Sequence, residues 1–322
     1  MKTYLVTGGC GFIGSNYVLK HLAAGDNVIN IDKLTYAATQ TSITAPNYKL
    51  VKADIADKAA VSAVFANNKI DYVVNFAAES HVDNSIHSPA EFIQTNIFGV
   101  FNLLECAREY YAKSKDFRFL HVSTDEVYGS LPKDGSMFTE KSQHRPNSPY
   151  SASKAASDHL VRAWHKTYGL PVVTTNCSNN YGPRQHKEKL IPKIIYNCVT
   201  EQPIPIYGKG ENVRDWIYVG DHINGIDLAL EKGKLGETYC FGGNAEKTNN
   251  EVVQIICGIM DEIRPRNNGK YADLITYVAD RAGHDLRYAI DDSKAATALG
   301  FKQEAGFEKH IKQTIEWYLA ND

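Results

Sequence analysis

A glycine-rich turn near the start of the chain constrains its fold more than any other stretch. Gly8, Gly11 and Gly14 follow a short apolar segment, residues 2–6, and open an amphipathic helical pattern that stops near Gly25. Glycines at this spacing let the backbone turn tightly and approach a pyrophosphate, which then rests on the N-terminus of the helix. The turn therefore predicts a strand–turn–helix unit that binds a dinucleotide.

Asp32 strengthens this prediction. It closes the next predicted strand, residues 27–31, at the distance expected of an acid that binds the ribose of a dinucleotide. A carboxylate there would repel a 2′-phosphate, so the sequence favours NAD over NADP as the cofactor. The structural alternative is a glycine-rich turn followed by a helix-capping aspartate.

Short strands alternate with amphipathic helices through the first half of the chain. Further strands are predicted at residues 48–52, 71–76, 117–122 and 171–175, and helices at 57–67 and 88–110. This alternation predicts an α/β fold with a Rossmann-type, doubly wound parallel sheet that binds ligands at the carboxyl ends of its strands. We expect residues 1–177 to form an NAD-binding Rossmann domain, to which segments near 211–235 return. Residues 178–322 are expected to form mainly a smaller mixed α/β lobe that binds a nucleotide sugar.

The composition excludes several classes of partner. The 322 residues include 35 Lys and Arg against 37 Asp and Glu, a net charge of −2 without charge blocks, so neither nucleic acid nor a membrane surface is expected. No apolar run reaches the roughly 20 residues that span a bilayer, and the first predicted strand leaves no room for a signal peptide. The six cysteines lack metal-ligand spacing, which predicts reduced thiols, no metal site and a cytoplasmic location.

The spacing of Tyr150 and Lys154 points to acid–base chemistry. Residues four apart on a helix share a face, and a cation beside a phenol lowers its pKa from about 10 toward the range in which it can act as a base. Thr124, Asp125 and Glu126 follow the strand predicted at 117–122 and should lie at its carboxyl end. The plainer interpretation is that the two acids are solvated or cap a helix, and that the Tyr-x-x-x-Lys spacing arose by chance.

Together, these residues resemble the extended short-chain dehydrogenase/reductase family, and within it the dTDP-glucose 4,6-dehydratases. The glycine turn and Tyr-x-x-x-Lys mark the superfamily. Narrower matches are Asp32-Lys-Leu-Thr-Tyr-Ala37, Ala77-Ala-Glu-Ser-His-Val-Asp83, Thr124-Asp-Glu-Val-Tyr-Gly129, Asn176-Cys-Ser-Asn-Asn-Tyr-Gly-Pro183, Arg214-Asp-Trp-Ile-Tyr-Val219 and Arg281-Ala-Gly-His-Asp285. The resemblance covers essentially the whole chain. Its specificity lies in Asp125 and Glu126, because members that only epimerise or oxidise a nucleotide sugar lack this acid pair.

The resemblance implies a role for each catalytic residue. Tyr150 would remove the proton from the sugar O4 while hydride moves from C4 to NAD, with Thr124 holding that oxygen and Lys154 tuning the phenol. Glu126 would then take the C5 proton while Asp125, as a neutral acid, protonates the departing C6 hydroxyl. Hydride would return to C6, so that NAD is not consumed. One neutral and one ionised acid require environments that push their pKa values apart.

The resemblance also assigns binding residues. For the cofactor they are Gly8, Gly11, Phe12, Ile13, Gly14, Asp32, Lys33, Leu34, Thr35, Asp54, Ile55, Ala77, Ala78, Ser80, Thr95, Tyr150, Lys154 and Asn180. For the nucleotide sugar they are Ser80, Thr124, Asn179, Lys189, Leu190, Pro205, Tyr207, Arg214, Asn249, Arg281 and His284. An arginine suits a pyrophosphate because its planar fork pairs two phosphate oxygens. Lys189 and Arg281 taken singly could instead be solvated surface charges.

Three positions depart from the usual pattern of the family. Asn84 stands where an arginine is usual, residues 184–187 replace a segment that contains an aromatic residue, and Ala282 stands where a proline is usual. None of these changes removes a catalytic group. Two of them fall near the expected nucleotide pocket, so the base and the sugar are less constrained than the reaction.

Four functions stay open at this point. They are a dTDP-glucose 4,6-dehydratase, the same reaction on another sugar nucleotide such as UDP-glucose, a nucleotide-sugar 4-epimerase, and an NAD-binding regulatory or scaffold protein. The resemblance further implies a homodimer through the helices at 88–110 and 150–168. Apolar residues on more than one face of the first of these, Phe98, Phe101, Leu103 and Leu104, fit an isologous interface, although a helix buried in its own domain looks the same.

Overall fold

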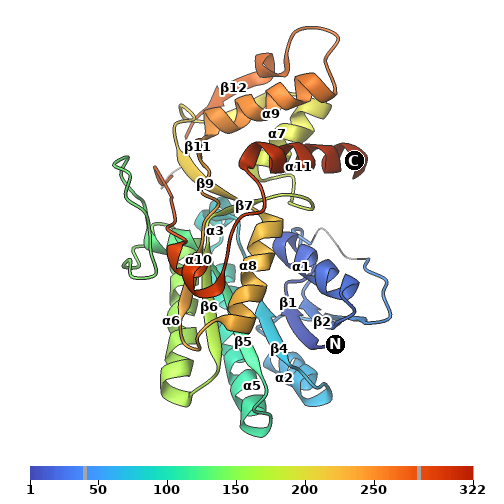
Figure 1. Cartoon of the computed structure of the whole chain (residues 1–322), viewed down its shortest axis with the longest axis vertical. Helices are drawn as coiled ribbons and strands as arrows, with labels where there is room; N and C mark the ends of the chain where they lie inside the picture. Colours follow the sequence, from blue (N-terminus) through green and yellow to red (C-terminus); the bar gives the residue numbers. More distant parts are fainter. Residues whose placement is uncertain (39–41, 281–283, 322) are drawn as a thin grey trace.

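The computed structural model describes residues 1–38, 42–280 and 284–321. Its largest element is a seven-stranded parallel sheet with the order β10-β6-β5-β4-β1-β2-β3 (Figure 1). The strands are β1 (Thr3–Thr7), β2 (Asn27–Asp32), β3 (Tyr48–Lys52), β4 (Tyr72–Asn75), β5 (Arg118–Thr124), β6 (Val172–Cys177) and β10 (Thr238–Phe241). Their carboxyl ends meet at one edge, where open α/β sheets bind ligands. The doubly wound, Rossmann-type fold predicted from the sequence is confirmed.

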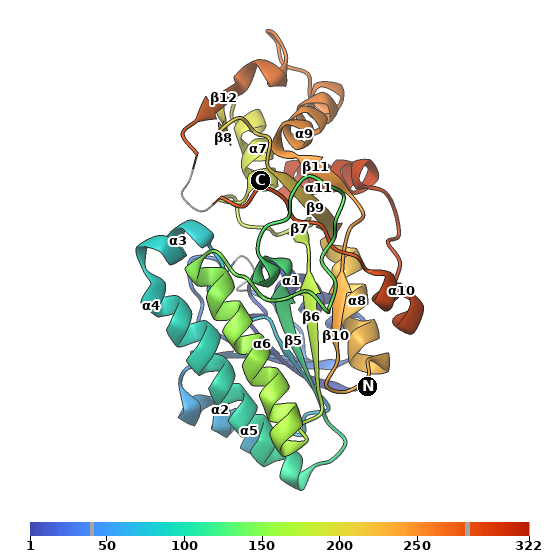
Figure 2. The same ribbon diagram turned by 90° about the vertical axis from the view of Figure 1, so that its left-hand side faces the viewer.

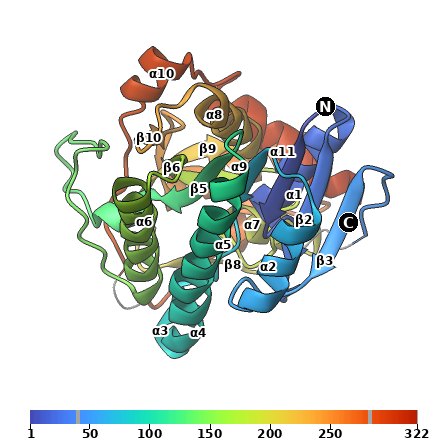
Figure 3. The ribbon, with the colours of Figure 1, turned by 90° about the horizontal axis from the view of Figure 1, so that it is seen from below.

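Helices cover both faces of this sheet (Figure 3). One face carries α2 (Lys58–Asn67), α5 (Val100–Lys113) and α6 (Pro149–Tyr168), whose apolar residues pack on Leu5 and Phe119 of the sheet. The other face carries α1 (Phe12–Ala23), α8 (Val219–Lys232) and α10 (Ser293–Leu299). Burial on both faces explains why the strands read as nearly continuous apolar runs.

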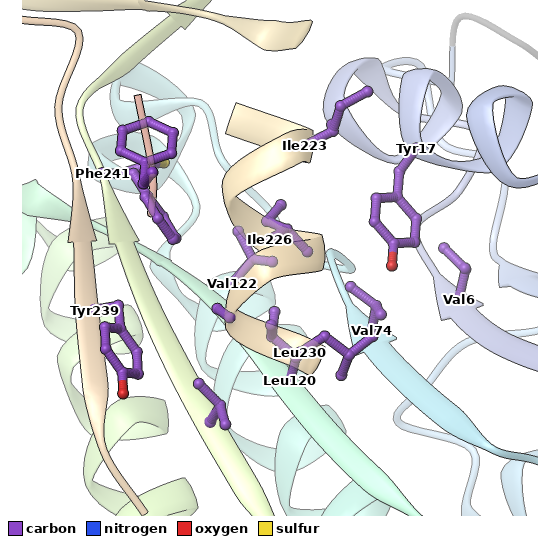
Figure 4. Packing of buried hydrophobic residues seen from close by; sticks show 14 of the residues in the cluster. Val6, Tyr17, Val74, Leu120, Val122, Ile223, Ile226, Leu230, Tyr239 and Phe241 are labelled. Carbon is purple, nitrogen blue, oxygen red and sulfur yellow. The ribbon is translucent and has the colours of Figure 1, made fainter. Parts of the chain in front are cut away.

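Helix α8 brings the last third of the chain back to the sheet (Figure 4). Ile223, Ile226 and Leu230 share one side of α8 and lie over sheet residues that include Val122 and Val74. The spacing of these three residues is that of a helix with one apolar face. The chain then adds β10 beside β6, a strand that the sequence analysis did not predict.

A smaller group of elements stands above the carboxyl edge of the large sheet (Figure 2). Its helices are α7 (Leu190–Val199), α9 (Asn249–Ile263) and α11 (Phe307–Asn321), which share one apolar core. Two small sheets accompany them, β11-β9-β7 and β12-β8. The strands of these sheets are β7 (Asn179–Tyr181), β8 (Ile204–Tyr207), β9 (Val213–Tyr218), β11 (Glu246–Thr248) and β12 (Ile275–Val278), and a 3₁₀ turn, η3 (Tyr271–Leu274), precedes β12. Since β7 begins two residues after β6 ends, this second lobe adjoins the ligand-binding edge.

The helix predicted at residues 88–110 is not regular. After α3 (Val82–His87), it consists of α4 (Pro89–Phe92), the π-helical segment η1 (Ile93–Gly99) and α5. A π-helical turn widens the backbone and is frequent at functional sites. Here the polar residues Thr95 and Asn96 of η1 are buried toward the ligand-binding edge.

Several local predictions are confirmed. Asp57 caps α2, since its side chain accepts hydrogen bonds from the N–H groups of Ala59 and Ala60. All six cysteines are buried free thiols. In the described ranges, none of the helices combines the length and apolar character needed to cross a membrane.

Candidate active site

The glycine turn forms a tight cradle at the start of α1. Gly8 has a φ of +71° and its position leaves no room for a Cβ, which would lie 2.7 Å from the backbone nitrogen of Ala77. A Cβ on Gly14 would lie 2.3 Å from the carbonyl oxygen of Gly8. Both glycines are therefore required by the packing of the turn itself.

Gly11 is different. A Cβ there would meet only the carbonyl oxygen of Gly8, at 3.4 Å, which is an ordinary contact. Packing in the protein therefore does not require a glycine at this position. The open space beside the helix N-terminus fits the close approach of a pyrophosphate. The geometry of the turn is therefore compatible with a bound dinucleotide.

Asp32, at the end of β2, faces the same turn. Its Oδ2 accepts a hydrogen bond from the N–H of Cys10 at 2.9 Å, and its Oδ1 accepts one from the N–H of Leu34 at 2.8 Å. These bonds fix the carboxylate at the cavity while leaving lone pairs on both oxygens. The carboxylate is therefore placed to accept further hydrogen bonds from a ribose.

The catalytic candidates lie at the carboxyl end of β5 and the start of α6. Thr124 ends β5 and caps the 3₁₀ turn η2 (Asp125–Tyr128), because its Oγ1 accepts from the N–H of Glu126 at 3.3 Å. Ser148 and Ser151 form a capping box at the start of α6, which fixes the first turn of that helix. This arrangement brings Tyr150 to the acid pair.

The expected net lowering of the pKa of Tyr150 toward the working pH is not found in the protein alone. Burial raises the pKa of Tyr150 well above 10, and the charges of Glu126 and Asp125 add to this effect, while a hydrogen bond with Thr124 opposes it. Nζ of Lys154 donates to the carbonyl oxygen of Val122 at 2.8 Å. The physical reason is that the sequence pattern reveals neither the burial of the phenol nor the two acids beside it.

Asp125 has the environment of a neutral acid. It is 1% exposed, and burial raises its pKa well above the ordinary value, with contributions from the charges of Glu126 and Asp215. Thr124 Oγ1 donates to Asp125 Oδ1 at 3.3 Å, and no hydrogen bond to Oδ2 is found among the described residues. An acid of this kind can hold a proton near neutral pH, as the assigned role requires.

One cavity of about 320 Å³ collects most of the predicted residues. Its lining includes Gly8, Gly11, Phe12, Ile13, Gly14, Asp32, Lys33, Thr35, Asp54, Ile55, Ala77, Ala78, Ser80, Thr95, Thr124, Asp125, Glu126, Tyr150, Lys154, Asn179, Asn180 and Lys189. Leu34 is absent from the lining, although its N–H helps to fix Asp32. The structure thus brings the glycine turn, the acid pair and Tyr150 into one space.

Most of the residues predicted to bind the nucleotide lie outside this lining, in the second lobe. Arg214 on β9 is buried, donates to the carbonyl oxygens of Val213 and Asp285, and packs over the ring of Tyr288 at 4.3 Å. Tyr207 and His284 face each other with ring centroids 6.4 Å apart. Leu190 begins α7, Pro205 lies on β8 and Asn249 begins α9. Arg281 and Ala282 lie outside the described residues, and the substrate contacts of this group stay predictions.

Asn96 is a residue of this site that the sequence analysis missed. Its amide accepts from the N–H of Glu79 at 2.9 Å and donates to the carbonyl oxygen of Glu79 at 3.0 Å. It also donates to Ser153 Oγ at 2.8 Å, and Ser153 donates to the carbonyl oxygen of Tyr150 at 2.7 Å. Asn96 therefore joins the loop after β4 to the catalytic helix. The sequence feature that could have indicated this role is a polar residue inside a long helix with many apolar residues.

Three loops form a rim around the mouth of the cavity. Glu188 lies between His81 and His186, with its Oε2 3.6 Å from a ring nitrogen of each. Asn84, one of the departures from the family pattern, donates to the hydroxyl of Tyr36 at 3.0 Å, and the ring of Tyr36 packs edge-on against His186. The departures at Asn84 and at residues 184–187 therefore belong to one connected rim.

Comparison with known proteins shows the family. A family model described as GDP-mannose 4,6 dehydratase matches residues 5–314. A dTDP-glucose 4,6-dehydratase from Xanthomonas campestris pv. campestris is 53% identical over 100% of this chain and 94% of its own length. The chain belongs to the dTDP-glucose 4,6-dehydratase family. The family model and this relative both carry the name of a sugar-nucleotide 4,6-dehydratase, but they name different sugar nucleotides.

Solved structures share the fold across two reactions. DesIV, a dTDP-glucose 4,6-dehydratase from Streptomyces venezuelae with NAD bound, has a TM-score of 0.89 at 42% identity, covering 99% of this chain and 97% of that chain. A UDP-glucose 4-epimerase from Thermus thermophilus in complex with NAD also has a TM-score of 0.89, at 28% identity, covering 99% of this chain and 100% of that chain. Because both enzymes fit equally well, the fold does not separate dehydration from epimerisation.

Proposed function

We propose that this protein is an NAD-dependent lyase that converts dTDP-glucose to dTDP-4-keto-6-deoxyglucose and water. The observation that carries the proposal is the position of Asp125 and Glu126 in one cavity with Tyr150 and the glycine turn. Full-length relatives at 53% identity bear the same activity in their names. An epimerase needs the phenol and the cofactor but no acid pair.

NAD supplies, when bound, a reversible hydride acceptor and a positively charged ring in this cavity. The residues that would hold it are the glycine turn, Asp32, Asp54 and Ile55, and Lys154 near its ribose. Tyr150 takes the proton from the O4 hydroxyl of the sugar, and Thr124 donates a hydrogen bond to that oxygen. Burial and the two acids disfavour a negative charge on Tyr150. The positive charge of Lys154 favours that negative charge and so partly opposes their effect.

The acid pair performs the elimination. The 4-ketone makes the proton on C5 acidic, and Glu126 takes that proton as general base. Asp125 gives its proton to the hydroxyl leaving C6, so that one molecule of water departs and a C5–C6 double bond forms. C6 would then receive the hydride that left C4, and Glu126 would return its proton to C5, which gives the 4-keto-6-deoxy sugar without net consumption of NAD. Burial favours a protonated Asp125, which is the state that this step requires.

The assay of the wild-type enzyme uses dTDP-glucose, UDP-glucose and GDP-mannose, with the alkali-induced absorbance of a 4-keto product as readout. Of the three substrates, we expect dTDP-glucose to give the most 4-keto product. A second candidate, dehydration of another sugar nucleotide, is favoured by the departures in the rim, and product from UDP-glucose alone would support it. Interconversion of glucose and galactose forms without a keto product would contradict the dehydratase.

The variants Asp125→Asn and Glu126→Gln separate oxidation from elimination. General acid and general base residues contribute about 10²–10⁴-fold each, so we expect keto-deoxy product to fall by that factor in both. Oxidation at C4 should continue, because Tyr150 and Lys154 are intact, and absorbance at 340 nm should rise on mixing with substrate. Full dehydration rates in both variants would refute the roles of the two acids.

The finer assignments belong to the same proposal. Asn179, Lys189, Leu190, Pro205, Tyr207, Arg214, Asn249, Arg281 and His284 contact the nucleotide half of the substrate. Residues 1–177, with later returning segments, bind the cofactor, and the second lobe binds the nucleotide sugar in a cytoplasmic enzyme. A homodimer is supported by Phe98, Phe101 and Tyr168, which are exposed on η1, α5 and α6; a monomer mass by light scattering at micromolar concentration would contradict it.

A further inference from the structure

A buried polar cluster lies below the catalytic residues and outside the cavity. Asp158 follows Lys154 by four residues, as Lys154 follows Tyr150, so all three share one face of α6. Each is at most 8% exposed. Asp158 does not line the cavity. A buried carboxylate that touches no ligand is costly unless it is paired and hydrogen-bonded, so its partners reveal its role.

Two strands hold one oxygen of Asp158. Ser123 Oγ, on β5, donates to Oδ2 at 2.9 Å, and Asn176 Nδ2, on β6, lies 3.3 Å from the same oxygen. The other oxygen, Oδ1, lies 3.4 Å from Nε2 of His121. The sheet therefore supplies hydrogen bonds to Oδ2, whereas Oδ1 has no hydrogen-bond partner among the described residues.

The protonation of His121 follows from its neighbours. The N–H of Ala77 donates to Thr7 Oγ1, and Thr7 Oγ1 donates to Asn75 Oδ1 at 2.5 Å, which fixes the orientation of the amide. Asn75 Nδ2 then donates to Nδ1 of His121 at 3.0 Å. Burial lowers the pKa of His121 to about 4, so the ring is neutral and its proton is on Nε2, facing Asp158.

Lys154 is the cation that faces this carboxylate. The titratable groups around Lys154 are Tyr150 and Asp158 on its own helix, His121 on β5 and Cys177 on β6. Burial raises the pKa of Cys177 to about 12, so its thiol is neutral. Burial lowers the pKa of Lys154, and the negative charge of Asp158 opposes that effect.

The groups that face Asp158 from other elements are also neutral. They are His121, Tyr128 of η2 and His144 of the loop that follows. Burial raises the pKa of Tyr128 and lowers the pKa of His144. Burial alone would raise the pKa of Asp158, but His121, Lys154 and Ser123 together hold it below its ordinary value. Asp158 and Lys154 are therefore buried groups of opposite charge on one face of α6, although no salt bridge within 4 Å joins them in the described part of the chain.

We propose that Asp158 is a positioning residue that keeps Lys154 protonated at the catalytic helix face, with Ser123 and Asn176 as the donors that hold its carboxylate in place. The reaction needs Lys154 as a cation beside Tyr150, so the inference about catalysis rests on the proposed function. The hydrogen-bonded chain from the N–H of Ala77 through Thr7 and Asn75 ends at His121, whose Nε2 lies 3.4 Å from Asp158 Oδ1. Asp158 thus acts on the reaction through Lys154 without touching substrate or cofactor.

The test measures the titration of Lys154 directly. The enzyme is labelled with lysine carrying ¹³C at Cε, and the Lys154 signal is identified by its loss in Lys154→Met. In Asp158→Asn, which removes the charge and keeps the shape, the titration midpoint of Lys154 should fall by at least about one pH unit. The alkaline limb of the kcat/KM profile should move down by the same amount.

Two variants separate charge from structure. Ser157→Ala removes another buried side chain of α6, which donates to the carbonyl oxygen of Lys154 at 2.8 Å, and should leave the midpoint unchanged. His121→Gln keeps the carboxylate and should shift the midpoint by less than Asp158→Asn. An unchanged midpoint in Asp158→Asn, or an equal shift in all three variants, would overturn the proposal.

A measurement on the unsubstituted enzyme covers the case in which Asp158→Asn does not fold. The ¹³Cγ shift of Asp158 should report an ionised carboxylate from pH 5 through the titration of Lys154. A protonated Asp158 above pH 6 would overturn the proposal. Neither NMR measurement uses substrate. If the dehydratase assignment is wrong, no 4-keto product will form, but the two NMR results will be unaffected.

Discussion

The floor and the rim of the cavity are built differently. The floor comprises the end of β5, the turn η2 and the start of α6, where Asp125, Tyr150 and Lys154 are 1%, 8% and 4% exposed. The rim comprises the loops that carry Tyr36, His81 and Glu188, and Tyr36 is 52% exposed. Charges are weakly screened in the floor and strongly screened in the rim. Under the proposed function, we expect the floor to determine the reaction and the rim to adjust which nucleotide sugar is held.

The largest expected effect comes from Tyr150→Phe, which removes the base of the floor. Loss of a general base costs about 10²–10⁴-fold, so we expect kcat for 4-keto product to fall by that factor while NAD still binds. The matched control is Tyr128→Phe, since Tyr128 is a buried phenol of η2 whose hydroxyl contacts Cys240 Sγ at 3.7 Å outside the cavity. An equal loss in both variants would mean that packing, not proton transfer, is being measured.

The glycine turn at the start of α1, outside the floor, offers a sharper comparison between two glycines. In Gly14→Ala the new Cβ would lie 2.3 Å from the carbonyl oxygen of Gly8, so we expect a loss of about 1–3 kcal/mol in the free energy of unfolding. In Gly11→Ala the nearest atom is 3.4 Å away, so stability should change by less than about 0.5 kcal/mol. NAD affinity should nevertheless fall at least about tenfold in Gly11→Ala, because the methyl group occupies the pyrophosphate space.

Thermal unfolding without cofactor and titration with NAD distinguish the two glycine variants. Unchanged NAD affinity in Gly11→Ala would contradict the assignment of the open space to a pyrophosphate. A stable Gly14→Ala protein would show that the turn can relax more than its contacts suggest.

Features of the structure that depend on local sequence patterns could be predicted from the sequence. The strands and helices of the first half were predictable because the sheet is buried on both faces, which imposes apolar runs and regular alternation. The glycine turn, Asp32 and the acid pair were predictable because each depends on local spacing. The three-residue strands β7 and β11 were not, because they are too short to show a period.

Tertiary contacts account for the remaining errors. Sequence spacing placed Lys154 beside Tyr150, but the raised pKa of Tyr150 arises from burial and from acids on another element. Asn96 joins Glu79 to Ser153 over distances of 17 and 57 residues in the chain. His121 and Asp158 looked like ordinary residues of a strand and a helix. Such pairings exist only once the sheet and α6 are packed together.

A pH-dependent prediction tests the floor through stability rather than activity. Burial raises the pKa of Asp125 in the folded state, so above the ordinary pKa of about 3.9 the folded chain retains a proton that the unfolded chain loses. Stability contributed by this group therefore falls as pH rises from that value. Asp125→Asn removes the ionisation, so its melting temperature should exceed that of the wild type by at least about 2 °C at pH 8 and less at pH 5. A difference independent of pH would contradict the buried, protonated acid.

The smallest expected effect comes from the rim, in Glu188→Gln. The carboxylate of Glu188 lies 3.6 Å from a ring nitrogen of each of two half-buried histidines, His81 and His186, which form ion pairs with it only when protonated, and even partly exposed ion pairs contribute only about 0–1 kcal/mol. We therefore expect KM for the sugar nucleotide to rise no more than about fivefold, with kcat unchanged. Lys193→Met is the matched control, because Lys193 is exposed on α7 and does not line the cavity, and it should leave both constants unchanged. A fall in kcat of more than tenfold in Glu188→Gln would place part of the chemistry in the rim, because a substitution that affects binding alone leaves the step after binding untouched.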